Sequence, residues 1–419
     1  MSSCRSKSHF LSCFVGAKQC LILALASALL LTSPYAFGDV GKVQTVHALK
    51  SNESYEPAII NVLDKLKIGD LTAALNLVDA HLELHPKSRI AHLVRADILK
   101  AHTNAVYSIG DGSALPEKEL LGLRDQLKNR WQHNKHQDSI AHTKLPSALV
   151  HIGQHPHVLV ADMEKGRLYV YENSDGQPEL IRDYYMSVGS AGYGKQVEGD
   201  NKTPVGVYHV NRYIEGKRLP DLYGKGAFPV NYPNRYDRFL KRTGYGIWLH
   251  GTPSTTYARS PWTSEGCFVL SNDDLLDIAQ YVSADARTPV ILSDKVEWIS
   301  RNELDQRRED LMAVVDGWKQ DWESLNNDAY LSHYSTDNLN FGATSFSKWA
   351  RTKRKLNASK TFVQVDLDVE EMFVYPGEDD MFVVSFTQNY LSNNYQGQVR
   401  KKQYWKRDQS GSWKIIYEG

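Results

Sequence analysis

The stretches Trp248-Leu249-His250-Gly251 and Ser264-Glu265-Gly266-Cys267 carry the strongest signal in this chain of 419 residues. Cys267 is the only cysteine beyond residue 20, because the other three lie within the first 20 residues. A lone cysteine with a histidine available is a candidate nucleophile. The first stretch ends an apolar run and Cys267 begins another. We therefore predict that two neighbouring strand ends bring His250 and Cys267 within hydrogen-bond reach.

Catalysis at Cys267 needs help from its neighbours. A thiol attacks a carbonyl only as the thiolate, and a free cysteine has a pKa of about 8.5, so a neighbour must lower this pKa or take the proton. His250 is the candidate base, and Gly251 lets a backbone carbonyl approach its second ring nitrogen and fix the tautomer. Gly266 permits a tight turn whose amides, with that of Cys267, point at a developing oxyanion. The Ser264 hydroxyl is a further expected donor.

The alternative interpretation is structural. An isolated cysteine and histidine are more often a small buried apolar residue and a satisfied core histidine. Four features favour the catalytic interpretation. A glycine lies beside each of the two residues, and the predicted export described below removes every other cysteine. Export also leads to an oxidising compartment, and further motifs surround the pair.

Residues 1–38 are predicted to be a Sec-type signal peptide, which makes the mature protein periplasmic. The segment has three basic and no acidic residues, an apolar run at 20–31, and small residues before a cleavage site after Gly38. An uncleaved anchor is the alternative, but the run is shorter than the roughly 20 residues that span a bilayer. Cleavage leaves a net charge of about −3, which provides no general field for nucleic acid or an anionic membrane.

The mature chain is too long for one hydrophobic core, and three regions separate by pattern. Residues 39–148 are predicted to be helical, with breaks at Gly69-Asp70 and His85-Pro86 that divide 59–98 into three helices. They resemble one tetratricopeptide unit. Such solenoids need about three repeats, so a packing role is favoured over a peptide groove. The helices are also candidate contacts for protein partners.

Residues 149–297 are predicted to form a β-rich domain, a sandwich or a barrel, from many short apolar runs. Ser271 to Asp274 is typical of a capping box, so Cys267 is expected on a strand that leads into a helix. The strands are expected at 157–162, 166–172, 180–188, 205–211, 246–250, 267–270 and 289–292.

Residues 305–419 are predicted to form an α+β cone after a charged helical stretch at 303–310. We expect helices near 311–322 and 329–335, with the cone's concave face near the catalytic cleft. Strands are expected at 361–370, 371–375, 381–391, 399–406 and 412–417. The aromatic residues of the region are interpreted as core rather than as a ligand box: Trp318, Trp322, Tyr330, Tyr334, Trp349, Trp405 and Trp413.

Two lesser patterns remain. His151, His155 and His157 alternate along one segment, but without nearby acidic or cysteine ligands we expect no metal, and we expect no cofactor. A basic cluster is interpreted as a solvated helix end, with contact to glycan or carboxylate as the alternative. Its members are Arg351, Lys353, Arg354 and Lys355.

Four stretches in this order resemble the L,D-transpeptidase catalytic domain family over about residues 155–295: 198–208, 232–238, 246–251 and 264–267. The resemblance implies Cys267 as nucleophile, His250 as general base and Gly251 as the carbonyl partner. It implies peptidoglycan stem peptides as substrate, attacked after the L-centre of diaminopimelate. We expect Trp248 and Tyr232 to contact that substrate.

The sequence departs from the family at two places, which bear on acceptor preference. Many members have His in place of Glu265, and Arg or Asn soon after the cysteine, where this chain has Phe268 and Val269. The C-terminal region resembles the nuclear transport factor two-like fold, as in related L,D-carboxypeptidases.

The expected function is therefore a peptidoglycan L,D-transpeptidase that forms a cysteine thioester in cell wall biogenesis and remodelling. With water as acceptor it is instead an L,D-carboxypeptidase that trims tetrapeptide stems and affects cell shape. A catalytically silent wall-binding module is the third alternative, although a binding module has no need of a free thiol.

Overall fold

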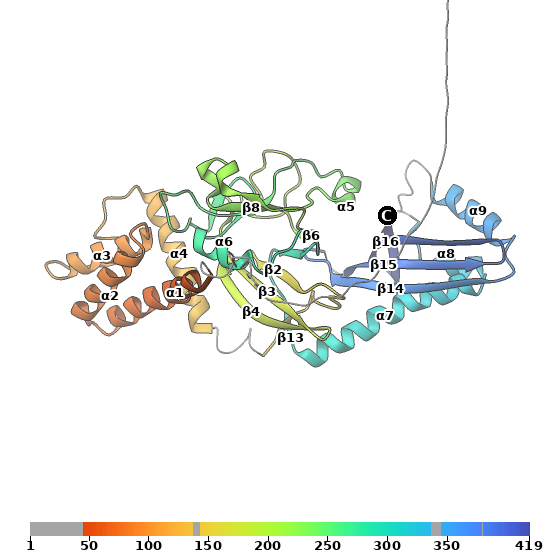
Figure 1. Ribbon diagram of the computed structural model, residues 1–419, viewed down its shortest axis with the longest axis horizontal. Coiled ribbons are helices and arrows are strands. Elements are labelled where there is room, and N and C mark those ends of the chain that lie inside the picture. The colour runs from red at the N-terminus through yellow and green to blue at the C-terminus, as the bar shows by residue number, and fades with distance from the viewer. Residues whose placement is uncertain (1–44, 137–142, 337–344, 379) are drawn as a thin grey trace, which may run out of the picture. The chain divides into compact units, whose positions relative to one another are not determined.

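A computed structural model describes residues 45–136, 143–336, 345–378 and 380–419 (Figure 1). The chain is multidomain, with N-terminal helices, a central β-rich domain and a C-terminal α+β domain. The predicted signal peptide, residues 1–38, lies outside the described residues. Within the described ranges, no helix has the length and apolar character needed to cross a membrane.

The N-terminal region contains the three predicted helices and a fourth. Gly69 adopts φ +78 in the predicted break, a left-handed conformation that glycine tolerates. Asp70 then caps the second helix by accepting from the Ala73 amide at 3.0 Å. The apolar faces of the helices form one core, which accounts for their packing role. The helices are α1 (Thr45–Lys67), α2 (Leu71–Leu84), α3 (Arg89–Ala101) and α4 (Glu117–His136).

The central domain is a sandwich of two main sheets, which decides between the two predicted architectures. Leu159 and Leu168 of one sheet share a core with Phe228, Leu249 and Phe268 of the other. The first sheet has the order β4-β3-β2-β12-β6, with β2 (His157–Asp162), β3 (Arg167–Ser174), β4 (Gln177–Tyr185), β6 (Gly206–His209) and β12 (Pro289–Ser293). The second has the order β11-β9-β8-β7, with β7 (Ile214–Glu215), β8 (Gly226–Pro229), β9 (Trp248–His250) and β11 (Phe268–Val269).

Short elements complete this domain. Ser271 accepts from the Asp274 amide at 3.0 Å and begins the predicted helix that follows the Cys267 strand. That helix is α6 (Asn272–Ile278), and the others are η1 (Gly216–Arg218), η2 (Asp221–Tyr223) and α5 (Arg235–Phe239). Two further strand pairs join β1 (Leu145–Pro146) to β13 (Trp298–Ile299) and β5 (Val188–Gly189) to β10 (Trp262–Ser264).

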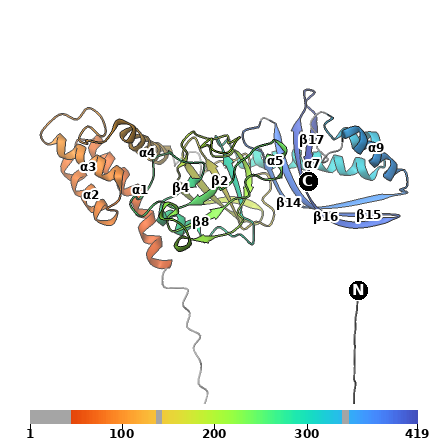
Figure 2. The ribbon, with the colours of Figure 1, turned by 90° about the horizontal axis from the view of Figure 1, so that it is seen from above.

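The C-terminal domain packs helices on one face of a four-stranded antiparallel sheet, and Figure 2 shows α7 and α9 on the same side of it. The charged stretch and the helix predicted after it are one continuous helix, α7 (Arg301–Glu323), begun by a capping box of Ser300 and Glu303. The strands expected at 361–370 and 371–375 are also one, with a bulge between Val369 and Glu371. The remaining elements are α8 (Asn327–Ser332), α9 (Phe346–Asn357), β14 (Val363–Val374), β15 (Met381–Ser392), β16 (Tyr395–Arg407) and β17 (Trp413–Glu418).

The aromatic residues of this domain form its core, as predicted. Five are buried, namely Trp318, Trp322, Tyr330, Tyr334 and Trp405, while Trp349 and Trp413 are half-buried against them. The basic cluster lies on α9, where three members are exposed but Lys353 is not. Its ammonium lies 5.7 Å from the ring centre of Trp322 and 5.5 Å from that of Trp349. The expectation of a fully solvated cluster is therefore wrong for Lys353, because its stem packs against aromatic rings.

The other face of the C-terminal sheet packs on the central domain. Tyr404 stacks on Tyr236 of α5 with ring centroids 4.2 Å apart, and Phe373 and Tyr375 share a core with Val160. The face toward the central domain is thus the one opposite the helices. This face is itself apolar and must be buried. The expected nearness of the concave face to the catalytic cleft stays a prediction.

Candidate active site

The strands that carry the two expected catalytic residues lie side by side. β9 ends at His250, and β11 begins directly after Cys267. The two strands are parallel neighbours, with Leu249 paired to Phe268 and His250 to Val269. The predicted adjacency of the two strand ends is therefore present.

His250 is held as a neutral base. Its side chain is buried, and Nδ1 lies 2.7 Å from the carbonyl oxygen of Gly251, the contact expected from the sequence. A carbonyl can only accept, so Nδ1 carries the proton and Nε2 keeps its lone pair. Burial lowers the pKa of His250 to about 4, so the ring is uncharged at neutral pH. Gly251 is required here, because a Cβ would approach Asn272 Oδ1 to 2.3 Å.

Cys267 rests as a thiol. Its side chain is half-buried, and Sγ donates to the carbonyl oxygen of Gly246 at 3.3 Å. Burial raises the pKa of Cys267 to about 11, against the lowering effects of the Trp248 backbone and the Arg259 charge. The sequence left two alternatives, a neighbour that lowers the pKa of the thiol or a neighbour that takes its proton. Because the pKa of Cys267 is raised, this site requires the second.

The turn before Cys267 differs from the expected oxyanion site. The Ser264 hydroxyl donates to the Cys267 carbonyl at 2.5 Å and accepts from the Gly266 amide at 3.1 Å. These two expected donors close the turn instead, because buried polar groups must be satisfied locally. Gly266 adopts φ +123, and a Cβ there would lie 2.8 Å from the Lys202 carbonyl oxygen. Of the three expected donors, only the Cys267 amide is not used within this turn.

The two expected substrate contacts differ in their surroundings. Trp248 is half-buried and packs against Tyr223, with ring centroids 4.8 Å apart, beside the thiol. Tyr232 is a core residue, and its hydroxyl donates to the Thr243 carbonyl at 3.0 Å. Its ring packs 5.9 Å from that of Tyr208, so Tyr232 has a packing role. Its expected contact with the substrate stays a prediction.

Two residues at the site were not found by sequence reasoning. The ring of Tyr223 lies edge-on to His250 at 5.0 Å, and the Cys267 charge contributes to its raised pKa, after burial. Arg259 is half-buried, and its charge acts on the pKa of both His250 and Cys267. Neither residue lies in a local motif. Only the course of two loops brings them to the strand ends, and no pattern in the sequence indicates that course.

Groups that could hold a metal ion lie elsewhere. The expectation that no acidic ligand lies near His155 is wrong, because Glu371 reaches it from a distant strand. Across the described ranges one cluster of histidine and carboxylate side chains could hold an ion, and it consists of His155, His209 and Glu371. It includes neither Cys267 nor His250.

Comparison with protein-family models identifies two domains in this chain. Residues 156–292 match the L,D-transpeptidase catalytic domain, and residues 310–419 match the Cds6 C-terminal NTF2-like domain. The chain therefore contains both domains, and the two resemblances predicted from the sequence are confirmed.

Solved structures with the same arrangement support this assignment. Bdellovibrio bacteriovorus Bd1075 is 29% identical, with a TM-score of 0.57 over 66% of this chain and 97% of that one. The helical cell shape determining protein Pgp2 from Campylobacter jejuni is 27% identical, with a TM-score of 0.55 over 70% of this chain and 100% of that one. No curated protein matches the chain in sequence.

Proposed function

We propose that this protein is a peptidoglycan L,D-transpeptidase that forms a thioester between Cys267 and a stem peptide. The observation that carries the proposal is the hydrogen bond from His250 Nδ1 to the Gly251 carbonyl. It leaves a neutral Nε2 as base on the strand next to the one that directly follows Cys267.

The proposed reaction has two halves. As the Cys267 sulfur attacks the carbonyl after the L-centre of diaminopimelate, the thiol proton passes to His250 Nε2. The carbon–nitrogen bond to the terminal D-residue then breaks, and His250 returns the proton to the leaving amine. An acceptor amine attacks the thioester, transfers a proton to His250 and releases the thiol.

Proton transfer during attack explains why the thiol need not be ionised at rest. A thiol with a pKa of about 11 and an imidazole with a pKa of about 4 remain a neutral pair at pH 7. Charge develops only in the transition state, where Arg259 and the Cys267 amide can stabilise it. These interactions are stronger in the transition state than in the resting enzyme, so they lower the barrier to attack.

Water is the second candidate acceptor, which would make the protein an L,D-carboxypeptidase. The pairing of the catalytic domain with an NTF2-like domain and the likeness to a helical cell shape determining protein favour it. Trimming of tetrapeptide stems would remove donors for cross-links. A silent wall-binding module is less favoured, because it would not need a base held in one tautomer beside a thiol.

We also propose that residues 1–38 direct export to the periplasm, because the proposed substrate lies outside the cytoplasm. The basic residues and apolar run of this segment support export.

Mass analysis of tetrapeptide stems incubated with the purified protein tests the function. Loss of the terminal D-residue without added amine supports the carboxypeptidase, and a new amide with added amine supports the transpeptidase. A Cys267→Ser variant is the control. Unchanged stems under both conditions would contradict both activities.

A further inference from the structure

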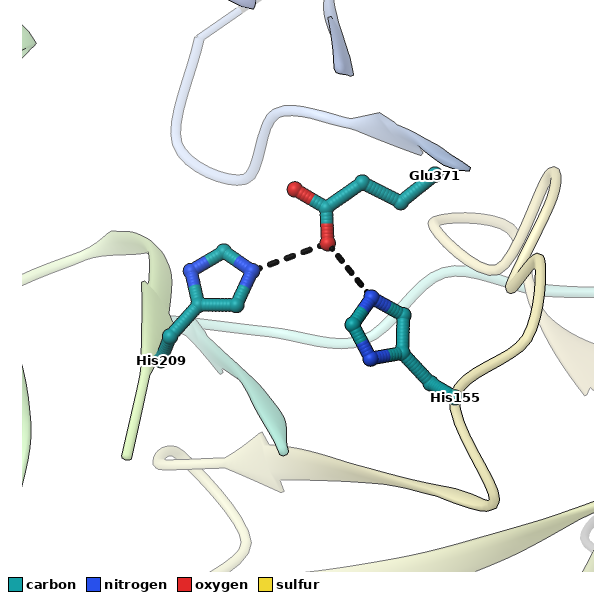
Figure 3. A group of neighbouring side chains, drawn as sticks. All are labelled: His155, His209 and Glu371. Atoms are coloured by element: carbon teal, nitrogen blue, oxygen red, sulfur yellow. Dashed lines mark hydrogen bonds and ion pairs between the residues drawn. The ribbon is translucent and has the colours of Figure 1, made fainter. Parts of the chain in front are cut away.

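Three side chains from distant segments converge where the central domain meets the C-terminal sheet (Figure 3). His155 precedes β2, His209 ends β6 and Glu371 lies on β14. The Nε2 atoms of His155 and His209 lie 3.0 and 2.8 Å from the same carboxylate oxygen, Oε2 of Glu371. His209 and Glu371 are buried and His155 is half-buried, so the cluster lies inside the protein rather than on its surface.

The tautomer of His155 leaves no proton between its Nε2 atom and Glu371. Its Nδ1 lies 3.2 Å from the carbonyl oxygen of Ala286, which can only accept, so Nδ1 carries the ring proton. A neutral His155 then presents the Nε2 lone pair to a carboxylate oxygen at 3.0 Å. Two lone pairs at this distance repel each other. Either a second proton or a metal cation must lie between them.

The hydrogen bonds around the cluster resemble those usually made by metal ligands. Ser385 Oγ and Lys402 Nζ hold the other oxygen of Glu371, Oε1, at 2.8 and 2.9 Å, which turns Oε2 toward the two imidazoles. Ligating histidines almost always donate their second N–H to a carbonyl, carboxylate or water, and ligating carboxylates are themselves hydrogen-bonded. His155 and Glu371 both follow this pattern.

A β-bulge and a close backbone contact bring the segments of the cluster together. The β-bulge between Val369 and Glu371 changes the direction of side chains along β14. The loop before His155 lies so close to this strand that a Cβ on Gly153 would be 1.8 Å from the Glu370 carbonyl oxygen. Only glycine permits this approach.

We propose that His155, His209 and Glu371 bind a Zn²⁺ ion that links the catalytic domain to the NTF2-like domain. Zinc takes imidazole nitrogen and carboxylate oxygen at about 2.0–2.2 Å, so tetrahedral ligand atoms lie about 3.3 Å apart. The observed nitrogen–oxygen distances of 3.0 and 2.8 Å are shorter than this spacing, and the three donor atoms lie within 4.8 Å of one another, so small shifts of the side chains would bring all three to one ion.

The fourth ligand would come from an adjoining cavity of about 680 Å³, which His209 and Glu371 line. Arg287, Arg400 and Lys402 also line this cavity, so water or an anion suits the open position. This site is separate from the reaction proposed at Cys267, and its test does not depend on that reaction.

Metal binding is best measured in the mature chain, residues 39–419, carrying Cys267→Ala, so that no cysteine thiol is left to bind the ion. After chelator treatment and dialysis, Zn²⁺ is titrated and counted by elemental analysis, and Co²⁺ is used as a spectroscopic probe. We expect one zinc per chain, a higher melting temperature with zinc, and the strong visible absorption of four-coordinate Co²⁺.

Glu371→Gln keeps the size of the side chain and should weaken zinc binding at least tenfold, as should His209→Ala. His157→Ala is the matched control, because this half-buried histidine of the same segment packs against Tyr281 outside the cluster. If His209→Ala does not fold, Glu371→Gln alone decides. The absence of stoichiometric zinc, or unchanged binding in Glu371→Gln, would overturn the proposal and show that His155 shares a second proton with Glu371 instead.

Discussion

Tyr55 of α1 and Tyr257 of the loop between β9 and β10 are stacked, with ring centroids 3.9 Å and planes 13° apart. The Tyr257 amide also donates to the Lys87 carbonyl at 3.2 Å. This loop carries Arg259, whose charge acts on Cys267. The N-terminal helices therefore hold a loop that contributes to the active site.

Tyr257→Ala should lower both stability and turnover. Loss of the half-buried Tyr257 ring should cost about 2 kcal/mol of the free energy of unfolding, and release of the loop should lower kcat/KM because Arg259 is no longer fixed. Thermal melting and kcat/KM on a stem peptide measure the two effects. Tyr107→Ala, at an 88% exposed side chain, is the control. A lower melting temperature with unchanged kcat/KM would show that the helices only support the fold.

Local patterns were sufficient to predict much of this molecule. The strand ends at His250 and Cys267 follow from short apolar runs, and the Gly251 contact follows from a glycine directly after the histidine. The Ser271 cap and the break at Gly69 are equally local. Such features depend on residues a few positions apart, so the sequence displays them directly.

Features that depend on distant segments could not be predicted. Glu371 reaches His209 across 162 positions of the chain, so no spacing in the sequence indicates the cluster. The Gly266 amide was expected to donate to the oxyanion. It donates to the Ser264 hydroxyl instead, and the sequence does not show how that side chain is oriented. The two-residue strand β7 has too few residues to show a period.

The acidic limb of the pH–rate profile should lie near the lowered pKa of His250. Only the neutral ring accepts the thiol proton, and burial lowers its pKa from 6.5 to about 4. Activity should therefore persist as the pH falls through 6.5 and be lost as it falls through about 4. Measurement of kcat/KM across this range tests the prediction, with circular dichroism at each pH to confirm that the protein is folded. A limb centred near 6.5 would show that the ring is not desolvated.

Alkylation of Cys267 should be slow at neutral pH and should accelerate with pH. The thiolate is the reactive form, and a pKa of about 11 implies roughly a tenfold rise in rate per pH unit between pH 7 and 10. Peptide mapping of the mature chain, residues 39–419, after iodoacetamide treatment should find one adduct, which Cys267→Ser abolishes. A rate that becomes constant above about pH 8 would indicate a lower pKa and an already ionised thiol.

Lys353→Ala should reduce turnover on intact sacculi more than on a short stem peptide. Lys353 lines a cavity of about 550 Å³ with Trp322, Tyr390 and Lys401, and burial lowers its pKa. Binding there would position a large substrate without contacting the scissile bond. A point substitution is preferable to truncation, because the C-terminal sheet shares a core with the catalytic domain.

The control for Lys353→Ala is Lys355→Ala, at an exposed position of the same helix. Equal rates for the two variants on sacculi would mean that the cavity takes no part in substrate binding.

The central claim is that Cys267 forms a thioester while His250 takes its proton. Intact-protein mass spectrometry after rapid mixing with a tetrapeptide stem and acid quench measures this directly. The account predicts one adduct with the mass of the stem lacking its terminal D-residue, located on Cys267 and absent from both Cys267→Ser and His250→Ala. Loss of the D-residue from the peptide with no adduct on Cys267, or an undiminished rate of adduct formation in a folded His250→Ala variant, would contradict it.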